Sequence, residues 1–230
     1  MDRVYRRQRY IYDLTRRYYL FGRDRMIREL ALSPSESVVE VGCGTARNLI
    51  RIARQYPGAE LFGLDASAEM LRTASGNVAR AGLSNRITLV QGYAEALGPE
   101  LFGRTKPFDH VLFPYSLSMI PDWRQALSAA GPSLSETGHL HVVDFGDLTG
   151  LGPVAAGVLR AWLRLFHVEP RVEILAAIEA KTEQGTASGQ RFRLLPARYA
   201  FLWTAAKDRI GTWSSHDVAV QSQQGGNSPS

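Results

Sequence analysis

Short apolar runs alternate with amphipathic segments along the chain from about residue 37 onward. Runs rich in β-branched and aromatic residues predict strands at 37–42, 60–65, 86–91, 108–114 and 139–145. Apolar positions at helical spacing predict helices at 46–56, 67–81 and 122–135, with a short one near 95–102. This alternation implies right-handed crossovers, and therefore an α/β fold with a mostly parallel sheet.

The pattern changes in the last third of the chain. Residues 190–195 and 198–203 are separated only by Pro196 and Ala197, and they predict a terminal antiparallel hairpin that closes one edge of the sheet. The last ten residues are polar and of low complexity, which predicts disorder. We therefore expect an N-terminal helical lid at 1–32, a main domain at 33–206 and a flexible tail at 207–230.

The stretch from Val38 to Asn48 carries the clearest chemical signal. An apolar strand runs into the glycine turn Gly42-Cys43-Gly44 and then into a helix, with the carboxylate of Glu40 just before the turn. The next predicted strand ends in Asp65, where an acid can bind ribose hydroxyls. Together these features predict a nucleotide-type pocket of the kind that binds S-adenosylmethionine.

Three alternatives exist for this turn. A dinucleotide fingerprint needs a third glycine where Arg47 stands, and a phosphate-binding loop needs a lysine that is absent. Glu40 would repel a pyrophosphate but suits a ligand that carries an ammonium and a sulfonium. The third alternative is an ordinary strand-to-helix turn, and Asp65 argues against it.

Ligands of such a sheet bind at the carboxyl ends of its strands, so the cofactor contacts should follow the predicted strands. The expected cofactor-binding residues are Glu40, Gly42, Cys43, Gly44, Asn48, Asp65, Ala66, Met70, Gly92, Tyr93, Ala94, Glu95, Phe113 and Tyr115. The loop after the fourth strand should face the acceptor. Its expected acceptor contacts are Ser116, Ser118, Met119 and Trp123, although core packing is an equal alternative for Trp123.

The N-terminus has a separate pattern. Tyrosines recur every seven residues at 5, 12 and 19, and arginines do so at 9, 16 and 23, which places an aromatic stripe beside a cationic one on a helix. One interpretation is a lid whose tyrosines line the acceptor pocket while Arg9 and Arg16 meet anionic headgroups. A solvated helix with one packed face, or a nucleic-acid surface, would give the same pattern.

A second segment favours lipid over nucleic acid. In residues 151–168, Arg160 and Arg164 share a helix face beside a wide apolar surface, so this helix can lie in a membrane interface or cross the core. The formal charge of +5 and the pI near 9.5 favour anionic partners. No run has transmembrane length and no signal peptide is evident, so we expect a cytoplasmic protein on the inner face of the membrane.

Cysteine and metal-ligand content add two expectations. Cys43 is the only cysteine, which excludes a disulfide within the chain and favours a reducing compartment. Inside a glycine turn, it is interpreted as a small packing residue. No spacing of histidines, cysteines and carboxylates predicts a metal site.

Several quoted segments together resemble one family. They are residues 2–20, the turn at 42–48, the Tyr-Ser-Leu-Ser-Met-Ile-Pro-Asp-Trp run at 115–123, and residues 144–146 and 166–171. Over about residues 1–206 the chain resembles the bacterial diacylglycerylhomoserine N-methyltransferases of betaine-lipid synthesis. The resemblance implies a Rossmann-like class I methyltransferase fold and three methyl transfers from S-adenosylmethionine to a lipid amine. Ala46 departs from the family, whose members usually have glycine there.

The implied reaction needs an unprotonated amine and oriented reactants. The catalytic candidates are Tyr12, Tyr19, Tyr115 and His167, which can hydrogen-bond to the amine or accept its proton, and aromatic rings also attract a quaternary ammonium. The alternatives are a phosphatidylethanolamine N-methyltransferase, a small-molecule or RNA methyltransferase, and a binding module without catalysis. We expect a lipid amine and an anionic membrane as partners, and no nucleic acid.

Overall fold

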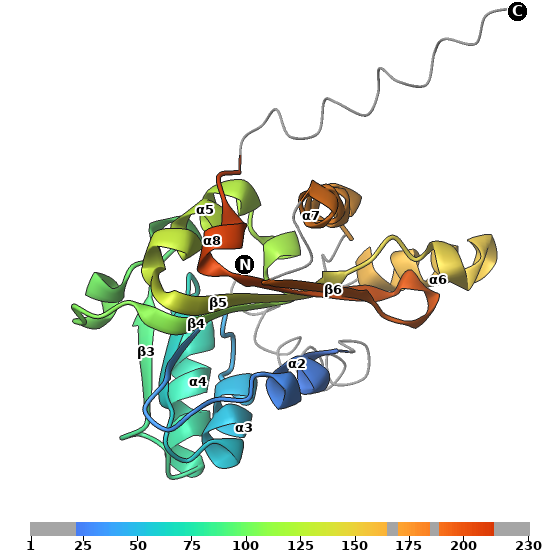
Figure 1. The fold of residues 1–230 in the computed structure, drawn as a ribbon. Helices are drawn as coiled ribbons and strands as arrows, with labels where there is room; N and C mark the ends of the chain where they lie inside the picture. The colour runs from blue at the N-terminus through green and yellow to red at the C-terminus, as the bar shows by residue number, and fades with distance from the viewer. Residues whose placement is uncertain (1–21, 165–169, 185–188, 214–230) are drawn as a thin grey trace, which may run out of the picture.

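The computed structural model describes residues 22–164, 170–184 and 189–213. They form a three-layer α/β fold in which helices cover both faces of one seven-stranded sheet (Figure 1). The strands are β1 (Ser37–Val41), β2 (Glu60–Asp65), β3 (Ile87–Gln91), β4 (Phe108–Pro114), β5 (Leu134–Phe145), β6 (Gln190–Leu194) and β7 (Ala200–Ala206). The α-helices are α2 (Arg23–Glu29), α3 (Arg47–Gln55), α4 (Ala68–Arg80), α5 (Trp123–Ser133), α6 (Pro153–Arg164), α7 (Val172–Gln184) and α8 (Lys207–Ile210). Short 3₁₀ turns lie at Ala94–Ala96, Pro99–Phe102, Leu117–Met119, Thr149–Leu151 and Pro196–Arg198.

The strand order is β3-β2-β1-β4-β5-β7-β6, and β7 runs antiparallel to both of its neighbours while the pairs from β3 to β5 are parallel. The predicted α/β fold and its terminal antiparallel hairpin are therefore confirmed. The order reverses between β1 and β4, and in such sheets this switch point opens the crevice in which ligands bind. The glycine turn follows β1, and the Tyr115 loop follows β4.

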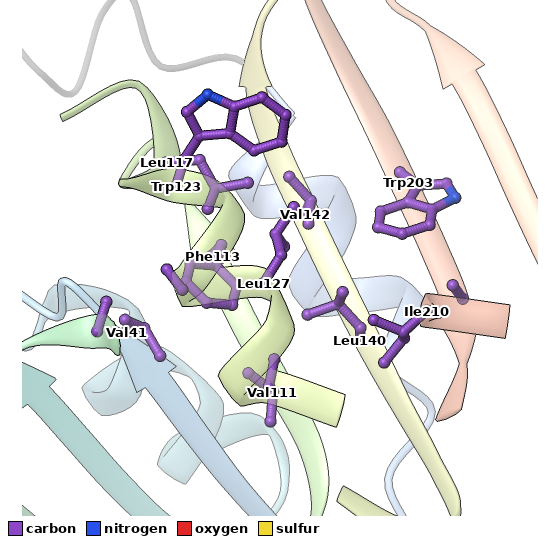
Figure 2. Packing of buried hydrophobic residues seen from close by; sticks show 14 of the residues in the cluster. Val41, Val111, Phe113, Leu117, Trp123, Leu127, Leu140, Val142, Trp203 and Ile210 are labelled. Carbon is purple, nitrogen blue, oxygen red and sulfur yellow. The ribbon is translucent and has the colours of Figure 1, made fainter. Parts of the chain in front are cut away.

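Two hydrophobic clusters hold the layers together, one on each face of the sheet. The first joins α2, α3, α4 and α6 to the sheet through residues such as Ile27, Leu49 and Leu163. The second joins α5, α7 and α8 to the other face, and Phe113, Trp123, Leu127, Trp203 and Ile210 belong to it (Figure 2). The crevice at the switch point borders the first cluster, because Cys43 and Tyr115 belong to it.

Strand β5 and helix α7 differ from the sequence prediction. Strand β5 begins at Leu134, whereas the pattern predicts a helix as far as 135 and a strand only from 139. Leu134 is fully buried and pairs with Phe108 of β4, so sheet pairing prevails over the helical pattern. Helix α7 is absent from the sequence prediction, and it buries Ile174 and Ile178 against the second face.

The expected tail boundary at 206 is also corrected. Residues 207–210 form α8, and Ile210 and Trp213 are buried. The Trp213 ring makes edge-to-face contacts with Trp123 at 5.7 Å and with Trp203 at 5.9 Å. These aromatic contacts extend the ordered core to residue 213. Within the described residues, no helix has the length and apolar character needed to cross a membrane.

Candidate active site

The glycine turn is held against the ends of two neighbouring strands. The N–H groups of Gly42 and Cys43 both donate to the carbonyl of Leu64 on β2. Gly42 has a φ of +72°, and a Cβ added there would lie 2.6 Å from Cβ of Ser116. Only glycine therefore allows the loop after β4 to approach the turn this closely.

Asp65 joins β2 to the second half of the turn. Its Oδ2 accepts the Gly44 N–H at 2.8 Å, and its Oδ1 accepts the Ser67 N–H at 2.9 Å. A carboxylate has further lone pairs beyond these two bonds, so Asp65 can still bind hydroxyl groups. A Cβ added at Gly44 would meet no atom within 4 Å, so this part of the turn has open space beside it.

Ala46 occupies a left-handed backbone position. It is the N-cap residue of α3, with a φ of +62°, and its methyl group is fully buried. The sequence alone left the sign of this angle open. An L-residue in this region carries strain of about 1–2 kcal/mol, which glycine would avoid.

Glu40 is a buried carboxyl group at the end of β1. Its Oε1 accepts a hydrogen bond of 2.7 Å from Asn48 Nδ2, and Oε2 has no partner among the described residues. Burial raises the pKa of Glu40 to about 8, although the Asn48 hydrogen bond and the charge of Arg23 oppose the rise. Glu40 is therefore mainly neutral at pH 7 and is poised to ionise beside a cation.

These residues surround a cavity of about 580 Å³. It is lined by the glycine turn, Glu40, Asn48 and Tyr115, and also by Arg23, Arg47, Arg51 and Arg54. The last three arginines recur along α3, while Arg23 comes from α2. Asp24 pairs with Arg51 at 2.5 Å. Guanidinium groups thus outnumber carboxyl groups around the cavity.

The loop after β4 brings Tyr115 and two serines to the switch point. Tyr115 is buried with a φ of +60°, and its ring packs edge-to-face on Phe145 at 4.7 Å. Burial raises the pKa of the Tyr115 phenol well above its usual value, so the group can donate a hydrogen bond but is a poor base. Ser116 and Ser118 are buried, whereas Met119 is 43% exposed.

Asp144, at the end of β5, fixes this loop. Its Oδ2 accepts the Ser118 N–H at 3.0 Å, and its Oδ1 accepts the Phe145 N–H at 2.8 Å. Burial raises the pKa of Asp144 to about 6. We assign Asp144 a positioning role. The sequence contained a signal for it, since Asp144 ends an apolar strand as Asp65 does.

The remaining expected cofactor contacts lie near the ends of β2 and β3. The Gly92 N–H donates to the Asp65 carbonyl, and Gln91 Nε2 donates to the Ala66 carbonyl at 3.1 Å. Met70 is half-buried in the first turn of α4, where its N–H donates to Ser67. Tyr93 is 72% exposed, Ala94 is buried and Glu95 is half-buried. None of these residues lines the cavity beside the glycine turn.

Two expected contacts are corrected. Phe113 and Trp123 lie in the second hydrophobic cluster, because their side chains pack with α5, α8 and the far face of the sheet (Figure 2). Cys43 lines the cavity but is mainly a packing residue. Burial raises the pKa of its thiol, so it is not a nucleophile at neutral pH.

Five candidates lie outside the described residues: Tyr12, Tyr19, His167, Arg9 and Arg16. Conversely, sequence reasoning did not assign the cavity-lining arginines Arg23, Arg47, Arg51 and Arg54 to the site. The spacing at 47, 51 and 54 places them on one side of a helix, but the sequence does not show that this side borders a cavity. The described residues contain no group of three or more side chains suited to a metal ion.

Comparisons with known proteins agree with this geometry. Residues 38–138 match the family model described as a methyltransferase domain. The chain is 33% identical over 196 residues to the ubiquinone/menaquinone biosynthesis C-methyltransferase UbiE of Syntrophotalea carbinolica, covering 83% of this chain and 77% of that protein. The chain belongs to the class I S-adenosylmethionine-dependent methyltransferases. The demethylmenaquinone methyltransferase of Corynebacterium glutamicum strain R is 31% identical over 157 residues, which is 66% of this methyltransferase and 61% of the relative.

Solved structures share the fold of this methyltransferase. The S-adenosylmethionine-dependent methyltransferase from Aquifex aeolicus superposes with a TM-score of 0.57 at 15% identity, covering 83% of this chain and 92% of that chain. The plantazolicin methyltransferase BpumL, solved with S-adenosylhomocysteine, gives a TM-score of 0.61 at 14% identity, covering 89% and 92%. At these identities the likeness concerns the fold alone.

The cofactor of this methyltransferase is S-adenosylmethionine, and the residues present fit it. The buried Glu40 Oε2 has no partner among the described residues, and the space beside Gly44 is open. A carboxyl group in a cavity suits a ligand that carries an ammonium and a sulfonium. Asp65 retains lone pairs for ribose hydroxyls.

Proposed function

We propose that this methyltransferase methylates the amine of diacylglycerylhomoserine in successive steps, as the sequence resemblance implies. The observation that carries the proposal is the set of four arginines around the cavity. The homoserine headgroup presents a carboxylate beside its amine, and guanidinium groups bind carboxylates through paired, charge-assisted hydrogen bonds. An acceptor with this headgroup would therefore match the charge of the cavity.

The same arginines would help to deliver the amine in its reactive form. A free alkylamine is mostly protonated at pH 7, and nearby positive charge lowers its pKa because it disfavours the ammonium. When bound, S-adenosylmethionine supplies the electrophilic methyl group. The contribution of the chain would be to bind the headgroup, to orient the amine beside Tyr115 and to exclude water.

The second candidate is C-methylation of a quinol, and the names of the two relatives favour it. A quinol ring carries no carboxylate for the arginines to bind. A quinol acceptor would leave the arginines without a carboxylate partner, so the identity of the acceptor decides between the two reactions. A phosphatidylethanolamine acceptor would place a phosphate on the arginines instead.

The test is transfer of labelled methyl groups from S-adenosylmethionine into diacylglycerylhomoserine, beside phosphatidylethanolamine, demethylmenaquinol and a lipid-free control. We expect label in the homoserine lipid in up to three steps. Label only in demethylmenaquinol would replace the proposal with the quinol reaction. Label only in phosphatidylethanolamine would support N-methylation of a lipid amine, but with a different headgroup from the one proposed.

Variants of the arginines sharpen this test. Arg47→Gln together with Arg54→Gln should raise the KM for the homoserine lipid about tenfold or more, because it removes two carboxylate-binding charges. Arg28→Gln together with Arg191→Gln is the matched control, since both arginines are exposed and neither lines the cavity. An unchanged KM in the double variant would remove these two arginines from headgroup binding.

A further inference from the structure

Helix α6 packs on the rest of the molecule through one face only. Ala156 and Leu163 on this inner face are buried in the first hydrophobic cluster, and Leu159 packs against it. Figure 1 shows α6 at the margin of the fold, beyond the central helices that cover the sheet. Its opposite side therefore faces outward.

The outer face of α6 is apolar as well. Val154 is 79% exposed and Val158 is 67% exposed, and they lie one turn apart on the side opposite Ala156 and Leu163. Ala155, Gly157 and Ala161 are exposed with them. A surface helix normally carries polar residues on its outer side, and a helix that is apolar on both sides is normally covered on both.

The only charged residues of α6 are Arg160 and Arg164, and both are exposed. Four residues apart, they share one side of the helix and flank the outer face. Between Asp147 and Glu169 the sequence contains no acidic residue. An apolar face flanked by two arginines, on a helix without acidic residues, matches the chemistry of an anionic bilayer surface.

We propose that the outer face of α6 docks this methyltransferase onto an anionic lipid membrane, with Val154 and Val158 inserted among the acyl chains and Arg164 at the phosphate level. The inference extends the proposed function, whose acceptor is a lipid. A second copy of the chain is a poorer occupant for this face. A helix about 18 Å long and 10 Å wide offers far less area than the roughly 800 Å² per partner of a stable interface.

The experiment is flotation of the full chain with vesicles, without acceptor or cofactor. Vesicles of phosphatidylglycerol and phosphatidylcholine are compared with vesicles of phosphatidylcholine alone. We expect binding to the anionic vesicles that weakens about tenfold or more in the variant Val154→Asp with Val158→Asp, because two charges would enter the apolar layer. Arg164→Gln should weaken binding less, and only to the anionic vesicles.

The control for the double variant is Ser75→Asp with Ala79→Asp on α4. These two small residues are also exposed and four residues apart, so the change in net charge and spacing is the same. If both double variants weaken vesicle binding equally, the effect comes from net charge alone and the role of α6 is overturned. Absence of binding by the unaltered chain would overturn it as well.

Two further readouts separate the remaining outcomes. If size-exclusion chromatography shows a dimer that the α6 double variant dissociates, the face is an interface between copies and the membrane proposal fails. Methyl transfer to an acceptor in detergent micelles should be unchanged in the α6 variant. If the unaltered chain transfers no methyl group to any tested acceptor, the proposed function is contradicted. The vesicle-binding result does not depend on that outcome.

Discussion

Asn48 donates a 2.7 Å hydrogen bond to Oε1 of Glu40, and the second carboxyl oxygen of Glu40 is buried without a partner among the described residues. The pKa of this carboxyl is about 8, mainly because burial disfavours its charge. The group is thus mainly protonated at pH 7. A cation that enters the cavity would reverse this preference.

Binding of S-adenosylmethionine should therefore release a proton from Glu40. We compare calorimetric titrations at pH 7 in phosphate and in Tris, whose ionisation enthalpies differ. The difference between the two apparent binding enthalpies should correspond to release of up to about one proton. In Glu40→Gln the dependence on buffer should vanish and the affinity should fall. Equal enthalpies in the two buffers for the unaltered chain would show that Glu40 does not ionise on binding.

The two glycines of the turn should respond differently to the same substitution. Gly42→Ala places a methyl group 2.6 Å from Cβ of Ser116 and should cost roughly 3 kcal/mol of stability. Gly44→Ala meets no atom within 4 Å, so it should cost only about 1 kcal/mol of backbone strain but weaken cofactor binding at least tenfold. Thermal unfolding and cofactor titration of both variants measure the contrast. Equal losses of stability would contradict it.

Ala46→Gly tests the strained N-cap of α3. The substitution removes a buried methyl group worth about 0.8 kcal/mol and relieves about 1–2 kcal/mol of left-handed strain, so stability should stay level or rise by up to about 1 kcal/mol. Ala53→Gly is the matched control, because Ala53 is also buried but lies inside α3. It should cost about 2 kcal/mol. The free energy of unfolding is measured with urea. Equal losses of stability in both variants would show that Ala46 is not strained.

Two buried histidines on β4 and β5 should make the fold sensitive to acid. His110 Nδ1 lies 3.0 Å from His141 Nε2, and His141 Nδ1 lies 3.2 Å from Thr204 Oγ1. Burial lowers the pKa of both histidines, and the neighbouring His139 acts in the same direction, while Glu36 and Asp109 oppose it at His110. Below pH 6.5 the unfolded chain binds protons that the folded chain excludes, so stability falls as the pH falls.

The variant His141→Gln should reduce this loss, by up to about 1.4 kcal/mol for each pH unit over which one proton is taken up. The comparison is urea unfolding of both chains at pH 7 and pH 5. Glu40 contributes the opposite slope, since the folded chain keeps its proton between pH 4.5 and about 8, but this contribution cancels between the two chains. If both chains lose the same stability between pH 7 and pH 5, His141 does not contribute to the acid sensitivity.

The parts of the site that lie within one local stretch could be predicted from the sequence. The strand, the glycine turn, Glu40 and the acid at Asp65 follow from residue type and spacing, because each position is fixed by its own strand. The fold follows for the same reason, since alternating strands and helices allow few topologies.

The parts that depend on tertiary packing could not be predicted. Phe113 and Trp123 stand next to pocket residues in the sequence, but the direction of each side chain relative to the sheet places them in the core. The role of Arg23 depends on how α2 packs against α3 and β5, which no local pattern encodes. Helix α7 could not be recognised because its apolar residues form no clear single stripe.

Strand β6 ends the order of the sheet, so its outer row of backbone groups has no partner strand among the described residues. It carries Arg191, which is exposed, and Arg193, which pairs with Glu29 of α2 at 3.1 Å. Charged side chains on an edge strand discourage other chains from adding to the sheet. The hairpin that completes this fold therefore also protects it from aggregation at high concentration.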